Sequence, residues 1–384
     1  MSSTEANSTP PHSNPRHGHA GSRIMALDAI RQLAAFVVLV QHFGVVFGVR
    51  GPQLFGHSLL KCPLFDAKAA VTLFFVLSGY VLTLSIRREP VSFRGYANFG
   101  IRRVLRLYPM HFAATLLAMA VLFWVRKNGG FLQGLPEGMD PGFLHTSGNQ
   151  TIQWLRQLTL VMPGMDSNFA NPPVWTLMTE AKVAIVFPFI AWGVLRLPPW
   201  FGIAMVSLLV LGSDWLDHHT VGTVALLGQF GLGALIARLP ADTFAPFGRW
   251  KWITWSLISL VLYSAVHFRY SVPNVWIAYY LGSFGAAGII IASIKWDSLN
   301  QKLTALQRFF RADISYGLYI LHFPIMLCLR KWSGETITSL SAPLLFAASV
   351  LLTIALSVAL MFVAERPAIE LGKRLTGKRP TPAP

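Results

Sequence analysis

Charged residues are scarce in this chain of 384 residues: they make up 12% of it, whereas hydrophobic residues make up 53%. A soluble domain of this length carries about twice that share of charge, so the composition excludes that class. Apolar runs of a length suited to about 30 Å of hydrocarbon recur along the chain. They cover residues 25–46, 67–86, 109–125, 174–195, 200–213, 220–238, 251–267, 275–294, 314–329 and 342–363. We therefore expect an all-α, polytopic membrane helix bundle of about ten transmembrane helices.

Cysteine is also scarce. With only Cys62 and Cys328, the chain has no disulfide framework and no thiolate metal cluster. A single bridge between the two, or two free thiols, both stay open. The adjacent His218 and His219 lack a spaced third ligand, so we expect no metal site there.

Acidic residues are outnumbered two to one, because 32 Lys and Arg face 16 Asp and Glu. If both termini are cytoplasmic, 21 of the basic residues fall in segments on the inner side and 8 in segments on the outer side. Cytoplasmic loops of membrane proteins carry such an excess. The net charge of +16 is thus explained by topology and by lipid head groups, and it requires no nucleic-acid partner.

The composition also divides the chain. Residues 1–23 are polar and lack an apolar run, which predicts a disordered cytoplasmic tail before the first helix. We expect one transmembrane domain over residues 24–366 and a basic cytoplasmic tail over residues 367–384. Within the domain, the outer segment 126–173 is too long for a simple connector, and loops of that size commonly form binding surfaces.

Two ionisable residues, Arg31 and His42, stand eleven positions apart in the first apolar helix. At about 100° per residue, this spacing places both on one face, about 16 Å apart along the axis. Such groups usually face a protein interior or a water-filled cavity. The alternative is that Arg31 extends to the surface and His42 is only hydrogen bonded. We favour a functional polar path, with Asp28 placed to hold the Arg31 guanidinium at the cytoplasmic mouth.

The loop 87–106 contains six arginines. Arg103 and Arg106 lie three positions apart, so they project from one side if the segment is helical. Two guanidinium groups on one side suit a phosphate. The alternative is a topological signal.

Glu180 follows Trp175 in the segment NPPVWTLMTE. A carboxylate within a spanning helix needs a partner. One candidate is His42, whose basicity such a contact would raise. The other is a salt bridge to Lys182 or Lys68.

Four further polar residues lie in apolar runs. Ser78 in FFVLSGY suits close helix packing, and it lacks the GxSxG setting of a serine nucleophile. Ser315 and Tyr316 open the run ISYGLYILHFP at the expected cytoplasmic side, and His322 lies at mid-membrane. They are candidate lining groups, although aromatic residues at a helix end are often interfacial anchors.

Together these stretches resemble the acyltransferase-3 family of integral membrane acyltransferases, which modify sugars at bacterial surfaces. LDAIRQLAAFVVLVQH, residues 27–42, is similar to the family's Arg/Lys-X10-His motif, with Arg31 and His42 on the two marked positions. FFVLSGY, the RxxR at Arg103 and Arg106, WTLMTE, SYGLYILHFP and ERP follow in the family's order.

The resemblance runs from about residue 25 to about residue 370, with a few departures. Ala29 and Gln32 stand where glycines are usual, and Thr176 replaces a common Ser. The SGNH-type hydrolase domain of some members is not expected here.

The resemblance implies transfer of an acyl group, usually acetyl from acetyl-CoA, to a hydroxyl of a carbohydrate or glycolipid at the outer face of the bacterial inner membrane. His42 would then be a general base or a transient acyl carrier. The implied residues are, for catalysis, His42, Glu180 and Arg31; for the donor, Arg103, Arg106, Arg31, Ser315 and Tyr316; for the acceptor, Trp175, His322 and Ser78.

Two other classes stay open at this point. A transporter or flippase would use Arg31, His42 and Glu180 as an intramembrane polar path, but the sequence shows no pair of related halves. A non-catalytic partner of a synthase would tolerate loss of His42. A homo-oligomer is compatible with either class.

Overall fold

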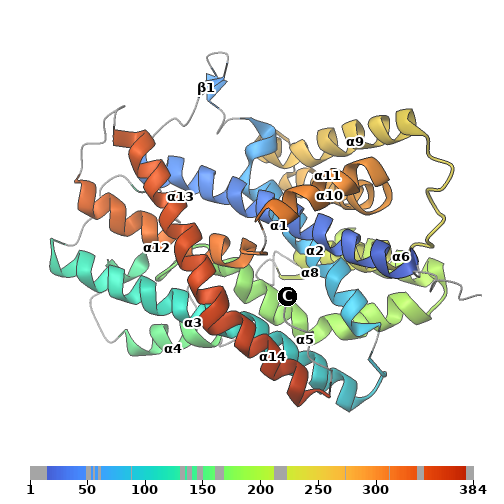
Figure 1. Ribbon diagram of the computed structural model, residues 1–384, viewed down its shortest axis with the longest axis horizontal. Helices are drawn as coiled ribbons and strands as arrows, with labels where there is room; N and C mark the ends of the chain where they lie inside the picture. The colour runs from blue at the N-terminus through green and yellow to red at the C-terminus, as the bar shows by residue number, and fades with distance from the viewer. Residues whose placement is uncertain are drawn as a thin grey trace, which may run out of the picture.

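Nearly all of the described chain is helical (Figure 1). This computed structural model describes residues 15–48, 53–54, 57–58, 62–87, 89–129, 135, 141–144, 150–160, 168–211, 223–272, 274–310, 312–334 and 341–377. The helices are α1 (Pro15–Phe47), α2 (Ala67–Ile86), α3 (Phe93–Lys127), α4 (Thr151–Thr159), α5 (Val174–Arg196), α6 (Pro199–Leu211), α8 (Thr223–Arg238), α9 (Arg249–Ser264), α10 (Val275–Lys295), α11 (Asp297–Phe310), α12 (Ser315–Ser333), α13 (Ser341–Leu360) and α14 (Arg366–Leu375).

The remaining elements are short. β1 (Gln53–Leu54) and β2 (His57–Ser58) form an antiparallel pair in which Gln53 faces Ser58. Turns of 3₁₀ helix cover Pro63–Phe65, Gly142–Leu144 and Ala265–Ser271, and a π-helical turn, Met361–Glu365, joins α13 to α14. The prediction of an all-α helix bundle is therefore confirmed.

Each of the ten predicted apolar runs overlaps a helix in the sequence. Six helical segments in the described part of the chain are long and apolar enough to cross a membrane, and α11 with α12, bent by 57°, would make a seventh. The chain is thus a multi-pass membrane protein. α6 and α8, with 13 and 16 residues, are shorter than the roughly 20 residues a full crossing needs, so ten crossings stay a prediction.

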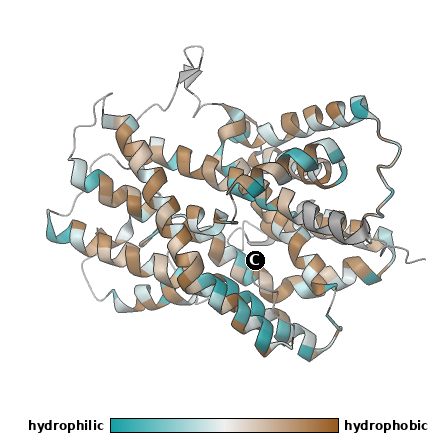
Figure 2. Cartoon of the chain, viewed as in Figure 1, coloured by the Kyte–Doolittle hydropathy of each residue, from teal (hydrophilic) through white to brown (hydrophobic). Residues whose placement is uncertain are grey.

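The two predicted tails contain helix. α1 begins at Pro15, inside the segment 1–23, and α14 occupies most of the described part of the segment 367–384. α14 lies along α3, where Gly372 is within reach of Leu105. Figure 2 shows hydrophilic residues on α14 and on the adjoining first half of α3. A periodic apolar side and a charged side make α14 a surface helix, which a search for apolar runs does not detect.

Glycines allow α2 and α8 to cross closely. A Cβ on Gly79 would lie 2.0 Å from the Phe230 carbonyl oxygen, and a Cβ on Gly233 would lie 2.1 Å from the Val76 carbonyl oxygen. No side chain fits at either position without moving a backbone. Small residues at helix contacts in membranes permit this close approach. Because Gly79 faces α8, the crossing sets the orientation of α2 and so the direction of the neighbouring Ser78.

α1 packs against α11 and α12, and Gln32 ties the three together. Its amide nitrogen donates to the Gln307 Oε1 at 2.9 Å and to the Ala312 carbonyl at 2.7 Å. Gln32, which stands where the family usually has a glycine, therefore holds the bend between α11 and α12 against α1.

Candidate functional site

A cavity of about 290 Å³ lies among α1, α2, α3, α5, α12 and α14. Its cationic lining residues come from three helices, and the rest of the lining consists of hydroxyl, aromatic and aliphatic side chains and one carboxylate. Seven residues that the sequence singled out line it: Arg31, Ser78, Arg103, Arg106, Glu180, Ser315 and Tyr316. The fold thus gathers residues that are up to 285 positions apart in the sequence.

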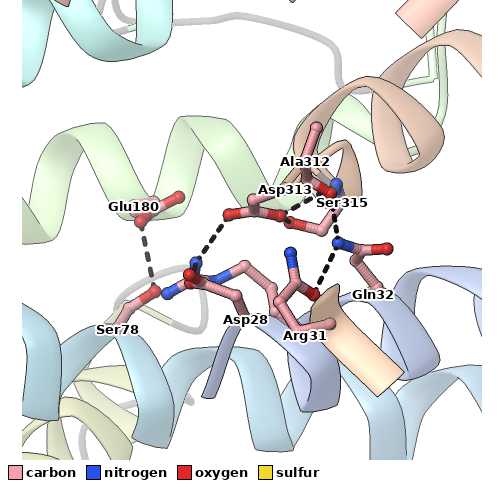
Figure 3. Close-up of polar contacts among 9 residues, drawn as sticks. Asp28, Arg31, Gln32, Ser78, Glu180, Ala312, Asp313 and Ser315 are labelled. Carbon is pink, nitrogen blue, oxygen red and sulfur yellow. Dashed lines mark hydrogen bonds and ion pairs between the residues drawn. The ribbon is translucent and has the colours of Figure 1, made fainter. Parts of the chain in front are cut away.

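Arg31 is held between two carboxylates (Figure 3). Its Nη1 donates to the Asp28 Oδ1 and to the Asp313 Oδ2, both at 2.9 Å. Asp313 also accepts from the backbone N–H of Ser315 at 3.1 Å and from its hydroxyl at 2.5 Å. Asp28 was expected, whereas Asp313 was missed because it meets Arg31 only through packing of α12 on α1. Ser315 thereby orients the carboxylate that fixes Arg31.

Glu180 contacts Arg103 and Ser78, not His42. Its Oε1 is ion paired with Arg103 and accepts from the Ser78 hydroxyl at 3.2 Å, a contact visible in Figure 3. Glu180 and His42 have similar depths when residues are counted along their helices, but depth alone does not say which helices face each other. α5 turns this carboxylate toward α3, where a guanidinium neutralises it.

Arg106 is the cavity arginine whose guanidinium has no carboxylate within 4 Å among the described residues. Arg31 and Arg103 are paired as above, and Arg102 is bound to Glu89 at 2.8 Å. Arg106 is exposed to the cavity.

Tyr316 also lines the cavity, but its hydroxyl is bound within the protein. It donates to the Leu107 carbonyl at 2.7 Å and so holds α12 against α3.

His42 and His322 form a buried pair. The His42 Nδ1 lies 2.7 Å from the His322 Nε2, and the ring centroids are 5.0 Å apart. His322 Nδ1 lies 2.9 Å from the Leu318 carbonyl. A carbonyl only accepts, so in the neutral pair His322 Nδ1 carries hydrogen and its Nε2 accepts from His42 Nδ1–H. This leaves a lone pair on His42 Nε2, which has no hydrogen-bonding partner among the described residues.

Arg31 and His42 share the face of α1 that packs on α12, as their spacing predicts. Arg31 reaches Asp313, directly before α12, and His42 reaches His322 within α12. We call the two regions of the bundle the Arg31 end and the His42 end.

Tyr319 separates the histidine pair from the cavity. Its ring lines the cavity and lies 6.3 Å from the His322 ring and 5.5 Å from the Phe74 ring, measured between centroids. Its hydroxyl is hydrogen bonded to the Thr176 hydroxyl at 2.9 Å. Tyr319 was not among the residues predicted from the sequence. A molecule in the cavity therefore meets this side chain before the histidines.

Trp175 lies apart from the cavity, in the first turn of α5 at the His42 end. Its ring contacts Phe75 at 6.1 Å between centroids, and the Lys68 Nζ lies 4.5 Å from the ring centroid.

Other sequence hypotheses are less informative. Cys62 and Cys328 are free, and His218 and His219 lie outside the described residues.

A family model and two named relatives indicate acyl transfer. A sequence model of Acyl_transf_3, an acyltransferase domain, matches residues 24–362. The chain is similar to an "O-acetyl transferase" of Shigella phage Sf6, with 24% identity over 310 residues, which are 78% of this chain and 83% of that protein.

Two other relatives match over shorter stretches. "Acyltransferase MdmB" of Streptomyces mycarofaciens is 28% identical over 169 residues, 43% of this chain, and the match spans 38% of that protein's length. "Protein 2 in picA locus" of Rhizobium radiobacter is 29% identical over 175 residues, 44% of this chain and 83% of that protein. No solved structure matches.

Proposed function

Because this chain belongs to the Acyl_transf_3 family and is therefore an acyltransferase, we propose that it moves an acetyl group from cytoplasmic acetyl-CoA to a carbohydrate hydroxyl at the outer face of the inner membrane. One observation carries the proposal: a cavity rich in arginine is lined at one side by Tyr319, whose ring lies beside a buried histidine pair in which His42 Nε2 has no partner among the described residues. Family membership favours catalysis over the transporter that the sequence left open.

The Arg31 end suits the phosphates of the donor. Arg106 lines the cavity and has no ion pair with a described carboxylate, and guanidinium groups bind phosphate through two N–H donors. Lys373 of α14 lines the same cavity. Beyond these cations the lining includes Phe74, Phe75 and Leu177, which suits the slender, uncharged pantetheine arm and leads the thioester toward Tyr319.

His42 would act through Nε2. As the acceptor oxygen bonds to the thioester carbon and the carbon–sulfur bond breaks, this nitrogen takes the hydroxyl proton and passes it to the departing thiolate. Alternatively the same lone pair attacks the thioester and carries the acyl group before the acceptor arrives. Both routes give the ester and free CoA thiol, and both need the tautomer that His322 imposes.

His322 would orient His42 and stabilise its protonated form. When His42 Nε2 gains a proton, its Nδ1–H remains bonded to the His322 Nε2. In the Ser-His-Asp triad a carboxylate accepts the corresponding hydrogen bond. The chain of hydrogen bonds stops at the Leu318 carbonyl, which cannot take a proton. The proton therefore returns through His42 Nε2.

A transfer assay tests this proposal. Purified protein in liposomes receives radiolabelled acetyl-CoA and base-deacetylated envelope glycan from a strain lacking the gene. We expect His42→Gln to lower the rate at least about 100-fold, the usual scale for a lost general base. His111→Gln, which removes another buried histidine outside the cavity, is the matched control and should keep the activity. Wild-type rates in a folded His42→Gln protein would refute the mechanism.

A further inference from the structure

Lys68, in the first turn of α2, is a neighbour of the reacting histidine. The backbone N–H of Ala67 donates to the Gln41 Oε1 at 2.7 Å, so the residue before Lys68 is bonded to the residue before His42. The charge of Lys68 acts electrostatically on His42. The ammonium therefore lies at the His42 end, where the proposed transfer would occur.

The Lys68 ammonium is placed to receive an anion. It lies over the Trp175 ring at 4.5 Å, and within the described ranges it has no hydrogen bond and no carboxylate within 4 Å. Its side chain is exposed. An ammonium that lies on an aromatic face can still donate hydrogen bonds to an anion from its other sides.

The nearby carboxylate of Asp66 is already committed. Its Oδ1 caps α2 by accepting from the backbone N–H of Lys68 at 2.8 Å and of Ala69 at 3.2 Å. Its Oδ2 accepts from Arg269 at 3.0 Å and from His267 at 3.2 Å. Burial lowers the pKa of Arg269, but the charge of Asp66 and the hydrogen bonds to Asp66 and Tyr270 together raise that pKa. Both carboxylate oxygens of Asp66 thus have partners other than the Lys68 ammonium.

We propose that the acceptor carries an anionic group, a carboxylate or a phosphate, and that Lys68 binds this group beside Trp175 while the acceptor hydroxyl faces His42. The inference rests on the proposed function and adds the chemical class of the second substrate. The Trp175 ring offers an apolar face for a sugar ring, and the ammonium supplies a charge-assisted hydrogen bond.

An anion at Lys68 also assists the chemistry proposed for His42. A cation beside an imidazole opposes its protonation. When the bound acceptor neutralises Lys68, that opposition falls at the moment the acceptor hydroxyl is present. Acceptor binding and proton uptake by His42 are thereby coupled.

The experiment compares Lys68→Gln, Lys68→Arg and Lys302→Gln in the liposome assay. Lys302, an exposed residue of α11 outside the cavity, is the matched control. With the deacetylated glycan that has received no further treatment, Lys68→Gln should raise the acceptor KM about tenfold, the effect of losing one charged hydrogen bond. Lys68→Arg should stay near wild type, and so should Lys302→Gln.

Two modified glycans distinguish the sources of the anion. One is reduced at its carboxylates with carbodiimide and borohydride, and the other has lost its phosphates to hydrofluoric acid. The treatment that removes the recognised group should raise the wild-type KM about tenfold and abolish the difference between wild type and Lys68→Gln. The responding arm identifies carboxylate or phosphate.

Three outcomes decide the matter. An unchanged KM in Lys68→Gln would overturn the inference, and so would an equal loss on the native glycan and on both modified glycans, which indicates an anchoring role alone. Absence of transfer by the wild-type protein would instead refute the proposed function. Failure of the inference about Lys68 is thus distinguishable from failure of the proposed function.

Discussion

Arg106 differs from the other arginines of the cavity because no carboxylate of the described chain lies within 4 Å of its guanidinium. An incoming phosphate gains most from such a charge, since it breaks no existing ion pair. We therefore expect Arg106→Gln to raise the KM for acetyl-CoA about tenfold, with little change in the acceptor KM. Arg94→Gln, at an exposed position of α3 outside the cavity, is the control. Steady-state kinetics with both substrates varied measure the effect, and an unchanged donor KM would leave Arg106 as a topological charge.

His322 is a positioning residue in this account, so its loss should change turnover more than binding. His322→Leu leaves the His42 Nδ1–H without its acceptor, and an unpaired buried donor costs about 1–3 kcal/mol. We expect kcat to fall roughly 10- to 100-fold while the donor KM stays within a factor of two. His322→Gln keeps an acceptor oxygen and should recover part of the loss. A His322→Leu enzyme with full kcat would show that His42 needs no partner.

The sequence identified residues better than it identified contacts. Arg31, Arg103 and Arg106 were found because charged groups stand out against apolar runs, and all three line the cavity. Asp313 and Tyr319 were missed, since an acidic residue near a helix start and a tyrosine in a helix are ordinary until the fold places them. Glu180 was given the wrong neighbour for the same reason, because which helices touch is a tertiary property.

At the scale of elements, the crossing of α2 and α8 depends on glycine. The contacts predicted for a Cβ at Gly79, 2.0 Å from a carbonyl oxygen, require the two backbones to separate. We expect Gly79→Ala to lower the thermal unfolding temperature by several degrees, as substitutions costing 1–3 kcal/mol do.

Gly100→Ala is the control for this substitution. Gly100 lies inside α3, and its Cβ would meet nothing within 4 Å. Alanine there should leave the unfolding temperature unchanged or raise it, because alanine favours helix over glycine by about 1 kcal/mol. Thermal scans in one detergent measure both variants. Equal unfolding temperatures for Gly79→Ala and wild type would contradict the close crossing.

Some helices could be predicted from the sequence and others could not. α2 occupies residues 67–86 as predicted, since its apolar residues are continuous and Asp66 caps its start. α4, α11 and α14 were not predicted as helices, because each alternates polar and apolar positions and amphipathic helices need a different search. α14 changes the site, since Ile369 and Lys373 line the cavity.

At the scale of the whole molecule, the proposed function requires that the donor and the acceptor bind at opposite ends of the bundle. The cations that line the cavity lie at the Arg31 end, whereas His42, Trp175 and Lys68 lie toward the other end. The excess of basic residues in the segments predicted to be cytoplasmic supports the Arg31 end as the inner one. The central claim is that the donor and the acceptor approach from opposite sides of the membrane.

Sealed inner-membrane vesicles with the cytoplasmic face outward test this claim most directly. Deacetylated glycan is enclosed in the lumen, a chemically distinguishable glycan is added outside, and radiolabelled acetyl-CoA, which does not cross lipid, is supplied outside only. We predict that the label accumulates in the enclosed glycan, that external esterase does not remove it, and that His42→Gln abolishes it. Label confined to the glycan outside would contradict the account, because donor and acceptor would then meet on one side.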